Sequence, residues 1–195
     1  LLAEANSLRA GHWQVGLGGD LYGQTLGILG LGSIGQKVAQ FAQVFGMRVI
    51  AWSENLTPQR AAESGVTWVS KRELFEQADI LTIHLVLSER SRGLVDAEAL
   101  GWMKPTARLV NTARGPIVDE PALLQALSNG RLAGAALDVY AEEPLPVDHP
   151  LRRLPNVLAT PHVGYVSEQN YRQFYQQMIE DIQAWAEGTP IRVLG

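Results

Sequence analysis

Three side chains that suit proton transfer and anion binding each stand beside a short apolar run of the sequence. Arg114 lies in "LVNTARGP", Glu143 in "YAEEP" and His162 in "LATPHVGY". An imidazole can exchange a proton near neutral pH, and a guanidinium can grip a small carboxylate with paired hydrogen bonds. Each residue alone has an ordinary interpretation as a surface cation, a turn acid or a loop histidine. Together they predict a site that binds a small anion and moves a proton.

A glycine-rich turn indicates a second kind of chemistry. The segment "GLGSIG" places Gly30, Gly32 and Gly35 in G-x-G-x-x-G spacing, after an apolar run and before a helical pattern. Such glycines allow a tight turn, a close approach to a diphosphate and close packing of helix on strand, and the first N–H groups of the helix attract an anion. The same spacing also occurs in turns that only pack a strand against a helix. In this strand–turn–helix context it predicts dinucleotide binding.

The end of the next apolar run, "VIAWSEN", bears on which dinucleotide is bound. A carboxylate for the adenosine ribose is expected about 20 residues after the glycines, and Ser53 stands 18 residues after Gly35. Serine does not repel a 2′-phosphate, but no arginine follows at once to neutralise one, since Arg60 is seven residues further on. Glu54 could bind the ribose instead, or the segment could be an ordinary surface turn. We predict NAD, with NADP as the alternative.

These residues need a framework that brings distant segments together. Short apolar runs rich in β-branched residues alternate with amphipathic segments, which is typical of a parallel sheet with crossover helices. The predicted strands are 25–29, 48–52, 79–85, 108–112, 133–139 and 156–160. The fold class is therefore α/β: a doubly wound, mostly parallel sheet with helices on both faces. In such a sheet ligands bind outside the carboxyl ends of the strands.

Three helices are predicted from apolar spacing and end signals. Helix 34–45 ends before Gly46, helix 119–127 begins with a capping Asp119, and helix 168–187 is the longest. The apolar residues that share one face are Ile34, Val38, Phe41, Ala42 and Phe45 in the first helix, and Tyr171, Phe174, Tyr175, Met178, Ile182 and Trp185 in the last.

The composition limits the classes of function. The 195 residues include 16 basic and 20 acidic side chains, for a net charge of -4, so we expect no nucleic-acid or acidic-membrane partner. The chain has no cysteine, which excludes disulfides and thiolate ligands and fits a cytoplasmic protein. We expect no metal site. No apolar run approaches the roughly 18 residues needed to span a bilayer. The start "LLAEANSLRAGHW" reads like the end of a helix, so we expect a fragment.

Four motifs, "GILGLGSIG", "LVNTARGPIVDEPAL", "GAALDVYAEEP" and "TPHVGY", occur in this order. With them, the sequence up to about residue 190 resembles the NAD-dependent D-isomer-specific 2-hydroxyacid dehydrogenases. That family includes D-lactate, D-3-phosphoglycerate, glyoxylate/hydroxypyruvate and formate dehydrogenases. The resemblance implies a Rossmann-like cofactor domain inserted into a split substrate domain, with the active site in the cleft between them.

The resemblance also assigns roles to residues. Arg114 matches the arginine that would bind the carboxylate of a 2-hydroxy or 2-oxo acid. His162 matches the histidine that would exchange the proton of the substrate oxygen during hydride transfer, and Glu143 matches the acid that would hold the other ring nitrogen. Asp138 matches an aspartate near the nicotinamide carboxamide. The candidate cofactor-binding residues are Gly30, Gly32, Ser33, Ile34, Gly35, Ser53, Thr112 and Asp138.

Three departures from the family pattern qualify this interpretation. Ser53 replaces the usual ribose-binding aspartate. Tyr165 stands where the phosphoglycerate enzymes commonly have a second glycine, which argues against that substrate. The family's amino-terminal half of the substrate domain is absent from this chain, so we expect the chain alone to bind cofactor but to lack a complete substrate pocket.

Three divisions of the chain follow from the resemblance. We expect residues 1–23 to form a helix end and an arm for dimerisation, 24–166 the dinucleotide-binding domain, and 167–195 a helix that returns toward the substrate domain. A homodimer follows by the same analogy. Glu143 argues against formate dehydrogenase, in which the partner of the histidine is typically an amide. A non-catalytic protein that senses nicotinamide cofactors, like corepressors of similar fold, is the alternative to an enzyme.

Overall fold

The computed structural model describes residues 2–193 of the chain. Seven strands form one sheet in the order β3-β2-β1-β4-β5-β6-β7, and every neighbouring pair is parallel. The strands are β1 (Thr25–Leu29), β2 (Arg48–Trp52), β3 (Thr67–Trp68), β4 (Ile80–Ile83), β5 (Arg108–Asn111), β6 (Gly134–Leu137) and β7 (Val157–Ala159). The order reverses between β1 and β4, the point at which such sheets bind ligands.

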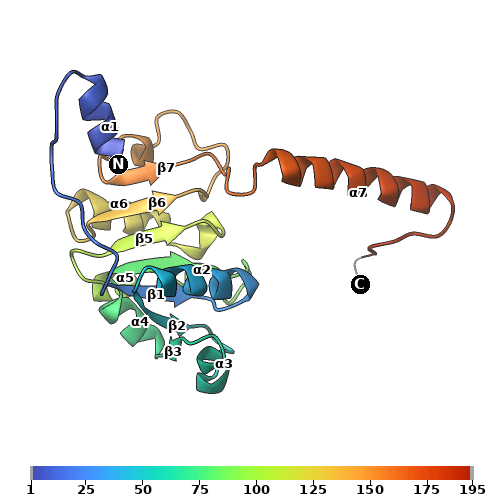
Figure 1. Ribbon diagram of the computed structural model, residues 1–195, viewed down its shortest axis with the longest axis horizontal. Helices are drawn as coiled ribbons and strands as arrows, with labels where there is room; N and C mark the ends of the chain where they lie inside the picture. Colours follow the sequence, from blue (N-terminus) through green and yellow to red (C-terminus); the bar gives the residue numbers. More distant parts are fainter. Residues whose placement is uncertain (1, 194–195) are drawn as a thin grey trace.

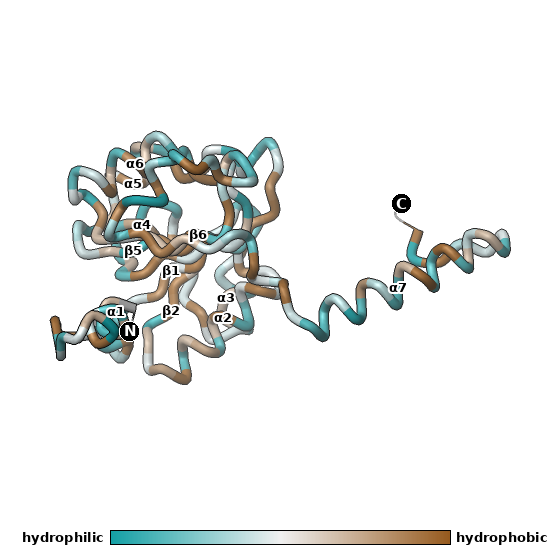
Figure 2. Tube along the Cα trace, turned by 90° about the horizontal axis from the view of Figure 1, so that it is seen from above, coloured by the Kyte–Doolittle hydropathy of each residue, from teal (hydrophilic) through white to brown (hydrophobic). Residues whose placement is uncertain are grey.

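Helices cover both faces of the sheet, which confirms the predicted doubly wound α/β fold. Figure 2 shows α2 and α3 on one side, and α4, α5 and α6 on the other. The α-helices are α1 (Leu2–Arg9), α2 (Ser33–Val44), α3 (Pro58–Ala62), α4 (Lys71–Gln77), α5 (Ala97–Trp102), α6 (Glu120–Ser128) and α7 (Glu168–Ala186), and short 3₁₀ helices are η1 (Gly115–Ile117) and η2 (Pro150–Arg152). Two buried apolar clusters, one under each helical layer, hold the sheet between them.

The predicted strands all exist, and two of them have the predicted bounds. The other four are shorter than predicted by one or two residues at one or both ends, where the bounds of an element are least sharply defined. Strand β3 and helices α3, α4 and α5 were not predicted individually, because each spans only two to seven residues. The outer strands β3 and β7 are largely exposed, unlike the buried runs of the central strands.

The apolar face predicted for α2 is only partly buried. Ala42 is buried and Val38 packs against the core, but Ile34, Phe41 and Phe45 are exposed, with 64%, 68% and 58% of their surface accessible. The buried side consists of small residues, Gly35, Ala39 and Ala42. Small side chains let the helix axis lie close to β1, and this close packing turns the bulky residues of the same helix away from the sheet.

The apolar side predicted for α7 is not covered by any other part of residues 2–193. No residue of α7 is buried, and Figure 1 shows the helix leaving the sheet on the side where the strand arrows end. After α7 the chain turns back, and Arg192 pairs with Glu180 (2.5 Å) and Asp181 (2.6 Å). Residues 1, 194 and 195, which belong to the predicted arm and return segment, lie outside the described residues. No helix within residues 2–193 is long and apolar enough to cross a membrane.

Candidate functional site

The residues singled out by the motifs lie along one edge of the sheet. Because all strands are parallel, the segments that follow them meet at the carboxyl edge. From β2 to β7 this edge presents Ser53, the glycine turn, Arg114, Asp138 and His162 in that order. A ligand lying along the edge would therefore pass the glycine turn on its way from the end of β2 to His162.

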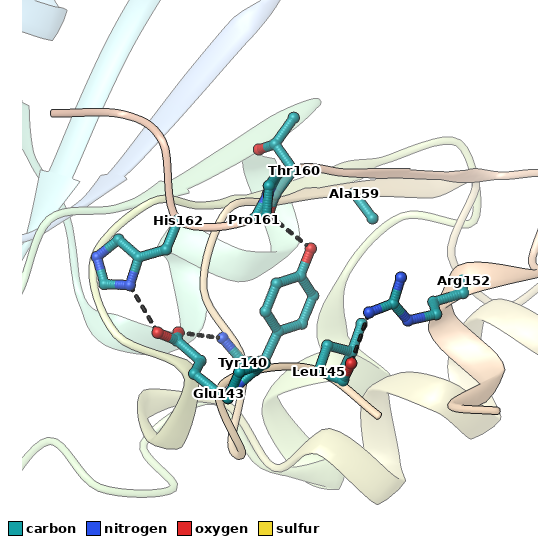
Figure 3. A pocket seen from close by; sticks show the side chains of 9 residues that line it. Tyr140, Glu143, Leu145, Arg152, Ala159, Thr160, Pro161 and His162 are labelled. Carbon is teal, nitrogen blue, oxygen red and sulfur yellow. Dashed lines mark hydrogen bonds and ion pairs between the residues drawn. The ribbon is translucent and has the colours of Figure 1, made fainter. Parts of the chain in front are cut away.

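His162 and Glu143 form a direct pair at the β7 end of this edge. The Nδ1 atom of His162 lies 2.7 Å from Oε2 of Glu143, and both side chains are about one third exposed. Oε1 of Glu143 accepts a hydrogen bond from the Tyr140 N–H at 2.9 Å. Burial opposes ionisation of Glu143, but these hydrogen bonds and the charges of His162 and Arg114 lower the pKa of its carboxyl below the ordinary value. Figure 3 shows the ring and the carboxylate pointing toward one another.

Asp138 holds the loop that carries His162. Its buried carboxylate accepts hydrogen bonds from Thr160 Oγ1 (2.5 Å), from the Val163 N–H (2.9 Å) and from the Gly164 N–H (2.8 Å). Burial raises the pKa of Asp138, but these hydrogen bonds and the charge of His162 outweigh it and lower that pKa. The motif did not indicate this role. The predicted contact of Asp138 with the cofactor stays a prediction.

A tight turn after β5 brings Arg114 to the same edge. The buried Asn111 side chain closes the turn, since it donates to the Arg114 carbonyl and accepts from the Ala113 N–H, both at 3.0 Å. A Cβ on Gly115 would lie 1.9 Å from the carbonyl oxygen of Tyr140. Only glycine lets these two segments touch, and that contact sets Arg114 close enough for its charge to act on Glu143.

Tyr140 connects the ends of β6 and β7. Its hydroxyl hydrogen is shared between the carbonyl oxygens of Leu137 (3.1 Å) and Thr160 (2.8 Å). Beside it opens a cavity of about 570 Å³ (Figure 3), which Glu143 and His162 also line. The His162–Glu143 pair therefore borders space that is large enough for a small organic acid.

The glycine turn fits a dinucleotide diphosphate. Gly30 has a φ of 103°, and a Cβ there would lie 2.8 Å from the His84 carbonyl oxygen, while a Cβ on Gly35 would lie 2.2 Å from the Gly30 carbonyl oxygen. Gly32 is different, because its Cβ position is open space. Gly32 caps α2 without a side-chain hydrogen bond, so the first N–H groups of α2, from Ser33 onward, remain available to an anion.

A second cavity extends from this turn past the end of β2. Its volume is about 470 Å³, and Ser53 and His84 line it together with Gly30 and Gly32. Burial lowers the pKa of His84, whose Nε2 lies 3.0 Å from Thr82 Oγ1. His84 thus borders the crevice as a half-buried, hydrogen-bonded ring.

Most of the predicted site residues share this edge. Arg114, Glu143 and His162 come together at the β5–β7 end, and the exposed Thr112 directly follows β5. Three residues that position the site were not predicted, namely Asn111, Gly115 and Tyr140. Their signal in the sequence is their place inside the motifs "NTARG" and "DVYAEEP".

The chain matches one protein family over most of its length. The model for the "D-isomer specific 2-hydroxyacid dehydrogenase, NAD binding domain" matches residues 1–164. A D-3-phosphoglycerate dehydrogenase of Bacillus subtilis is 43% identical over 97% of this chain and 37% of its own length. A glyoxylate reductase of Korarchaeum cryptofilum is 40% identical over 93% of this chain and 56% of its own length. The chain thus spans about a third to a half of these curated relatives.

A solved structure agrees with the sequence matches. The phosphoglycerate oxidoreductase from Vibrio cholerae superposes with a TM-score of 0.90 at 42% identity, and the match covers 96% of this chain and 62% of that one. None of these relatives, and no feature of residues 2–193, favours the non-catalytic sensor over an enzyme.

Proposed function

We propose that this chain, which belongs to the D-isomer specific 2-hydroxyacid dehydrogenase family and matches its NAD binding domain, is part of an NAD(P)-dependent oxidoreductase. The enzyme transfers a hydride between the nicotinamide and a D-2-hydroxy acid/2-oxo acid pair. The observation that carries this proposal is the 2.7 Å contact between His162 and Glu143, beside a cavity at the carboxyl edge.

The Glu143 contact supports Nε2 as the atom of His162 that exchanges the proton. An ionised carboxylate only accepts hydrogen bonds, so Nδ1 of His162 carries a hydrogen toward Glu143. Nε2 is then the atom that gives a proton to the substrate oxygen during reduction and takes it back during oxidation. The negative charge of Glu143 stabilises the imidazolium that forms.

Arg114 supplies the positive charge for the substrate. Its guanidinium is exposed at the turn after β5 and donates one hydrogen bond to the neighbouring Ala113 carbonyl, at 2.6 Å. The other N–H groups of its planar fork suit a carboxylate, which would orient the adjacent carbonyl toward His162.

The glycine turn and the α2 N-terminus would hold the dinucleotide diphosphate. Gly30 and Gly35 are required by close backbone contacts, and the open position at Gly32 leaves room for a phosphate. When bound, the nicotinamide supplies or accepts the hydride. Ser33, Ile34, Ser53, Thr112 and Asp138 are the remaining proposed cofactor contacts.

Kinetics of the intact protein test this proposal. We expect turnover of one or more small 2-oxo acids in a panel that includes glyoxylate, hydroxypyruvate and pyruvate, with NADH and NADPH assayed in parallel. His162→Ala should lower kcat by about 10² to 10⁴ while cofactor affinity stays unchanged, because only the proton donor is lost. Arg114→Ala should mainly raise KM.

Arg153→Ala, at an exposed position directly after η2, is the control and should behave as the unchanged protein. Normal kcat in His162→Ala would contradict the proposed proton transfer. A substrate panel with no turnover would contradict the enzymatic function.

We also propose a homodimer that forms through residues 1–23 and α2. The exposed side of α2 presents Phe41, Val44 and Phe45, and Tyr22 of the arm packs over Gly46 at the end of that helix. The Gly23 N–H donates to the Gly46 carbonyl at 3.0 Å, so the arm and the helix form one apolar surface. Exposed apolar surfaces of this kind commonly mark protein interfaces.

Sedimentation equilibrium tests the dimer. The unchanged chain should sediment as a dimer, and Phe41→Asp should shift it toward monomer, because burial of an unpaired charge is costly. Val147→Asp, at an exposed loop position, is the control. A monomer at every concentration would contradict the proposal.

A cytoplasmic location is proposed as well. It is supported by the absence of cysteine, which fits a reducing compartment. The division into an arm, a dinucleotide-binding domain (24–166) and a C-terminal segment (167–195) is likewise a proposal, supported by the exposure of both flanking parts.

A further inference from the structure

The cavity at the end of β2 has an unusual charge for an adenosine-ribose site. It has a volume of about 470 Å³ and extends from Gly30 and Gly32 to Ser53, Arg60 and Arg90. In a dinucleotide-binding fold, the residue directly after the second strand faces the 2′ position of the adenosine ribose. Here that residue is Ser53, which follows the last residue of β2. A carboxylate at this place would repel a phosphate, whereas a serine hydroxyl can donate a hydrogen bond to one.

Two arginines from separate elements line the same cavity. Arg60 lies in α3, and Arg90 lies in the loop that follows β4. Both are exposed, and neither guanidinium makes an ion pair or a hydrogen bond with another residue of the described chain. The convergence of the two cations supplies what the sequence alone did not indicate, since no arginine directly follows Ser53. Two guanidinium forks and a hydroxyl match the charge and the acceptors of a phosphate monoester.

The backbone around both arginines is held in place. The Arg60 N–H donates to Thr57 Oγ1 at 3.3 Å, in the first turn of α3. Arg90 precedes Ser91, whose buried hydroxyl accepts from the Ser88 N–H and donates to the Val86 carbonyl at 2.8 Å and 2.7 Å. A fixed backbone lowers the entropy cost of bringing the two side chains to one anion.

One acidic residue opposes a phosphate in this cavity. Glu54 also lines it and is exposed. Its carboxylate could accept hydrogen bonds from ribose hydroxyls, which would favour the unphosphorylated dinucleotide. Two arginines line the cavity along with this single carboxylate, and arginine binds phosphate through paired, charge-assisted hydrogen bonds that are stronger than a single bond to a hydroxyl.

We propose that Arg60, Arg90 and Ser53 form a subsite for the 2′-phosphate of NADP(H), so that this chain binds NADP(H) more tightly than NAD(H). The inference rests on the proposed function, because it requires a dinucleotide on the glycine turn. It reverses the preference for NAD that the sequence suggested.

Direct binding tests the subsite without an assay of activity. NADPH and NADH are titrated into the purified protein and followed by nicotinamide fluorescence or by the heat of binding. Adenosine 2′,5′-bisphosphate and 5′-AMP serve as probes without a nicotinamide. We expect the dissociation constant of NADPH to be about tenfold lower than that of NADH, and the bisphosphate to bind more tightly than 5′-AMP.

Variants separate the contributions of the side chains. Arg60→Ala and Arg90→Ala should each weaken NADPH binding about fivefold and change NADH binding less than twofold. Ser53→Asp should reverse the preference, and Glu54→Gln should strengthen NADPH binding. Arg108→Ala, at the exposed start of β5 on the opposite edge, is the matched control and should change neither.

Two outcomes distinguish this inference from the function on which it rests. If NADH binds as tightly as NADPH, or if both arginine variants bind NADPH as the unchanged chain does, the 2′-phosphate subsite is wrong and the proposed function stands. If neither dinucleotide binds, the proposed function itself fails.

Discussion

His162 has a backbone conformation that a non-glycine residue adopts at a cost. Its φ of 55° lies in the left-handed region, which typically costs on the order of 1 kcal/mol or more and occurs often at functional sites. The loop keeps this conformation because the Asp138 carboxylate binds the backbone N–H groups of Val163 and Gly164 and the hydroxyl of Thr160. At the scale of single residues, Asp138 therefore positions His162 by holding its neighbours.

Asp138→Asn should lower the free energy of unfolding by about 2 kcal/mol at pH 7, since an amide nitrogen would face an N–H donor in a buried site. The pKa of Asp138 is lowered in the folded state, so its contribution is present in full above the ordinary value of 3.8. As the pH falls through the lowered pKa, that contribution is lost, and the two proteins should converge in stability. Urea unfolding between pH 7 and pH 2 measures both effects.

Asp148→Asn is the control for this substitution, because Asp148 is exposed. It should leave the unfolding free energy within about 0.5 kcal/mol at every pH. Equal stability of Asp138→Asn and the unchanged chain at pH 7 would contradict the positioning role.

The start of α2 differs from the start of the later helices. The caps of α3, α4, α5, α6 and α7 are side chains that accept a backbone hydrogen bond, whereas α2 begins at Gly32 without one. Gly30 and Gly35 are fixed by close backbone contacts, but Gly32 has open space where a Cβ would lie. The folded chain therefore does not require glycine at residue 32, and we attribute this glycine to the proposed diphosphate site.

Gly32→Ser tests this argument at the scale of the element. A serine N-cap should keep or raise the unfolding free energy, by about 0.5 kcal/mol, because its hydroxyl can accept from the free N–H groups. The same hydroxyl would occupy the space of the diphosphate, so dinucleotide affinity should fall more than about tenfold. Calorimetric titration and urea unfolding measure the two quantities on one sample.

Gly30→Ser is the contrasting variant. Its side chain meets the His84 carbonyl and its φ is 103°, so it should lower stability as well as binding. Unchanged dinucleotide affinity in Gly32→Ser would contradict the phosphate site at α2.

At the scale of the whole molecule, two parts of the chain add little to the core. All residues of α1 and the arm from 3 to 22 are exposed or half-buried, and α7 has no buried residue (Figure 1). The apolar side of α7, with Phe174, Met178, Ile182 and Trp185, borders a shallow groove of its own. The buried core is built from the chain between the start of β1 and the end of β7, residues 25–159. Its stability should depend little on α7.

Removal of residues 167–195 should therefore leave the thermal unfolding midpoint of this chain within about 2 °C. Differential scanning calorimetry of the chain ending at Val166 measures the change. As a control, a chain that ends before β7, at residue 155, should not fold, because Ala135 and Leu137 would lose their paired strand. A fall of more than about 5 °C for the first truncation would show that α7 belongs to the core.

The sequence determined the features that depend on local chemistry. Apolar runs indicated six of the seven strands, because a strand buried on both faces needs consecutive apolar residues. The glycine turn was recognisable because backbone contacts restrict Gly30 and Gly35 to glycine. Arg114, Glu143 and His162 stood out because few residue types bind a carboxylate or exchange a proton near neutral pH. The order of these motifs was enough to predict the fold and the family.

Tertiary structure alone decided which faces are buried and what surrounds the site. The residue spacing in α2 does not determine which face of the helix packs on the sheet. The close approach of α2 to β1 requires the face with small residues there. The convergence of Arg60 and Arg90 on the cavity beside Ser53 joins segments 30 residues apart, a relation that no local pattern encodes. The bonds of Asp138 and Tyr140 to the segment after β7 likewise depend on the packing of neighbouring strand ends. Local sequence specifies the residue types of a site and the helical or strand period of each segment. Contacts between distant segments arise only when the sheet has formed.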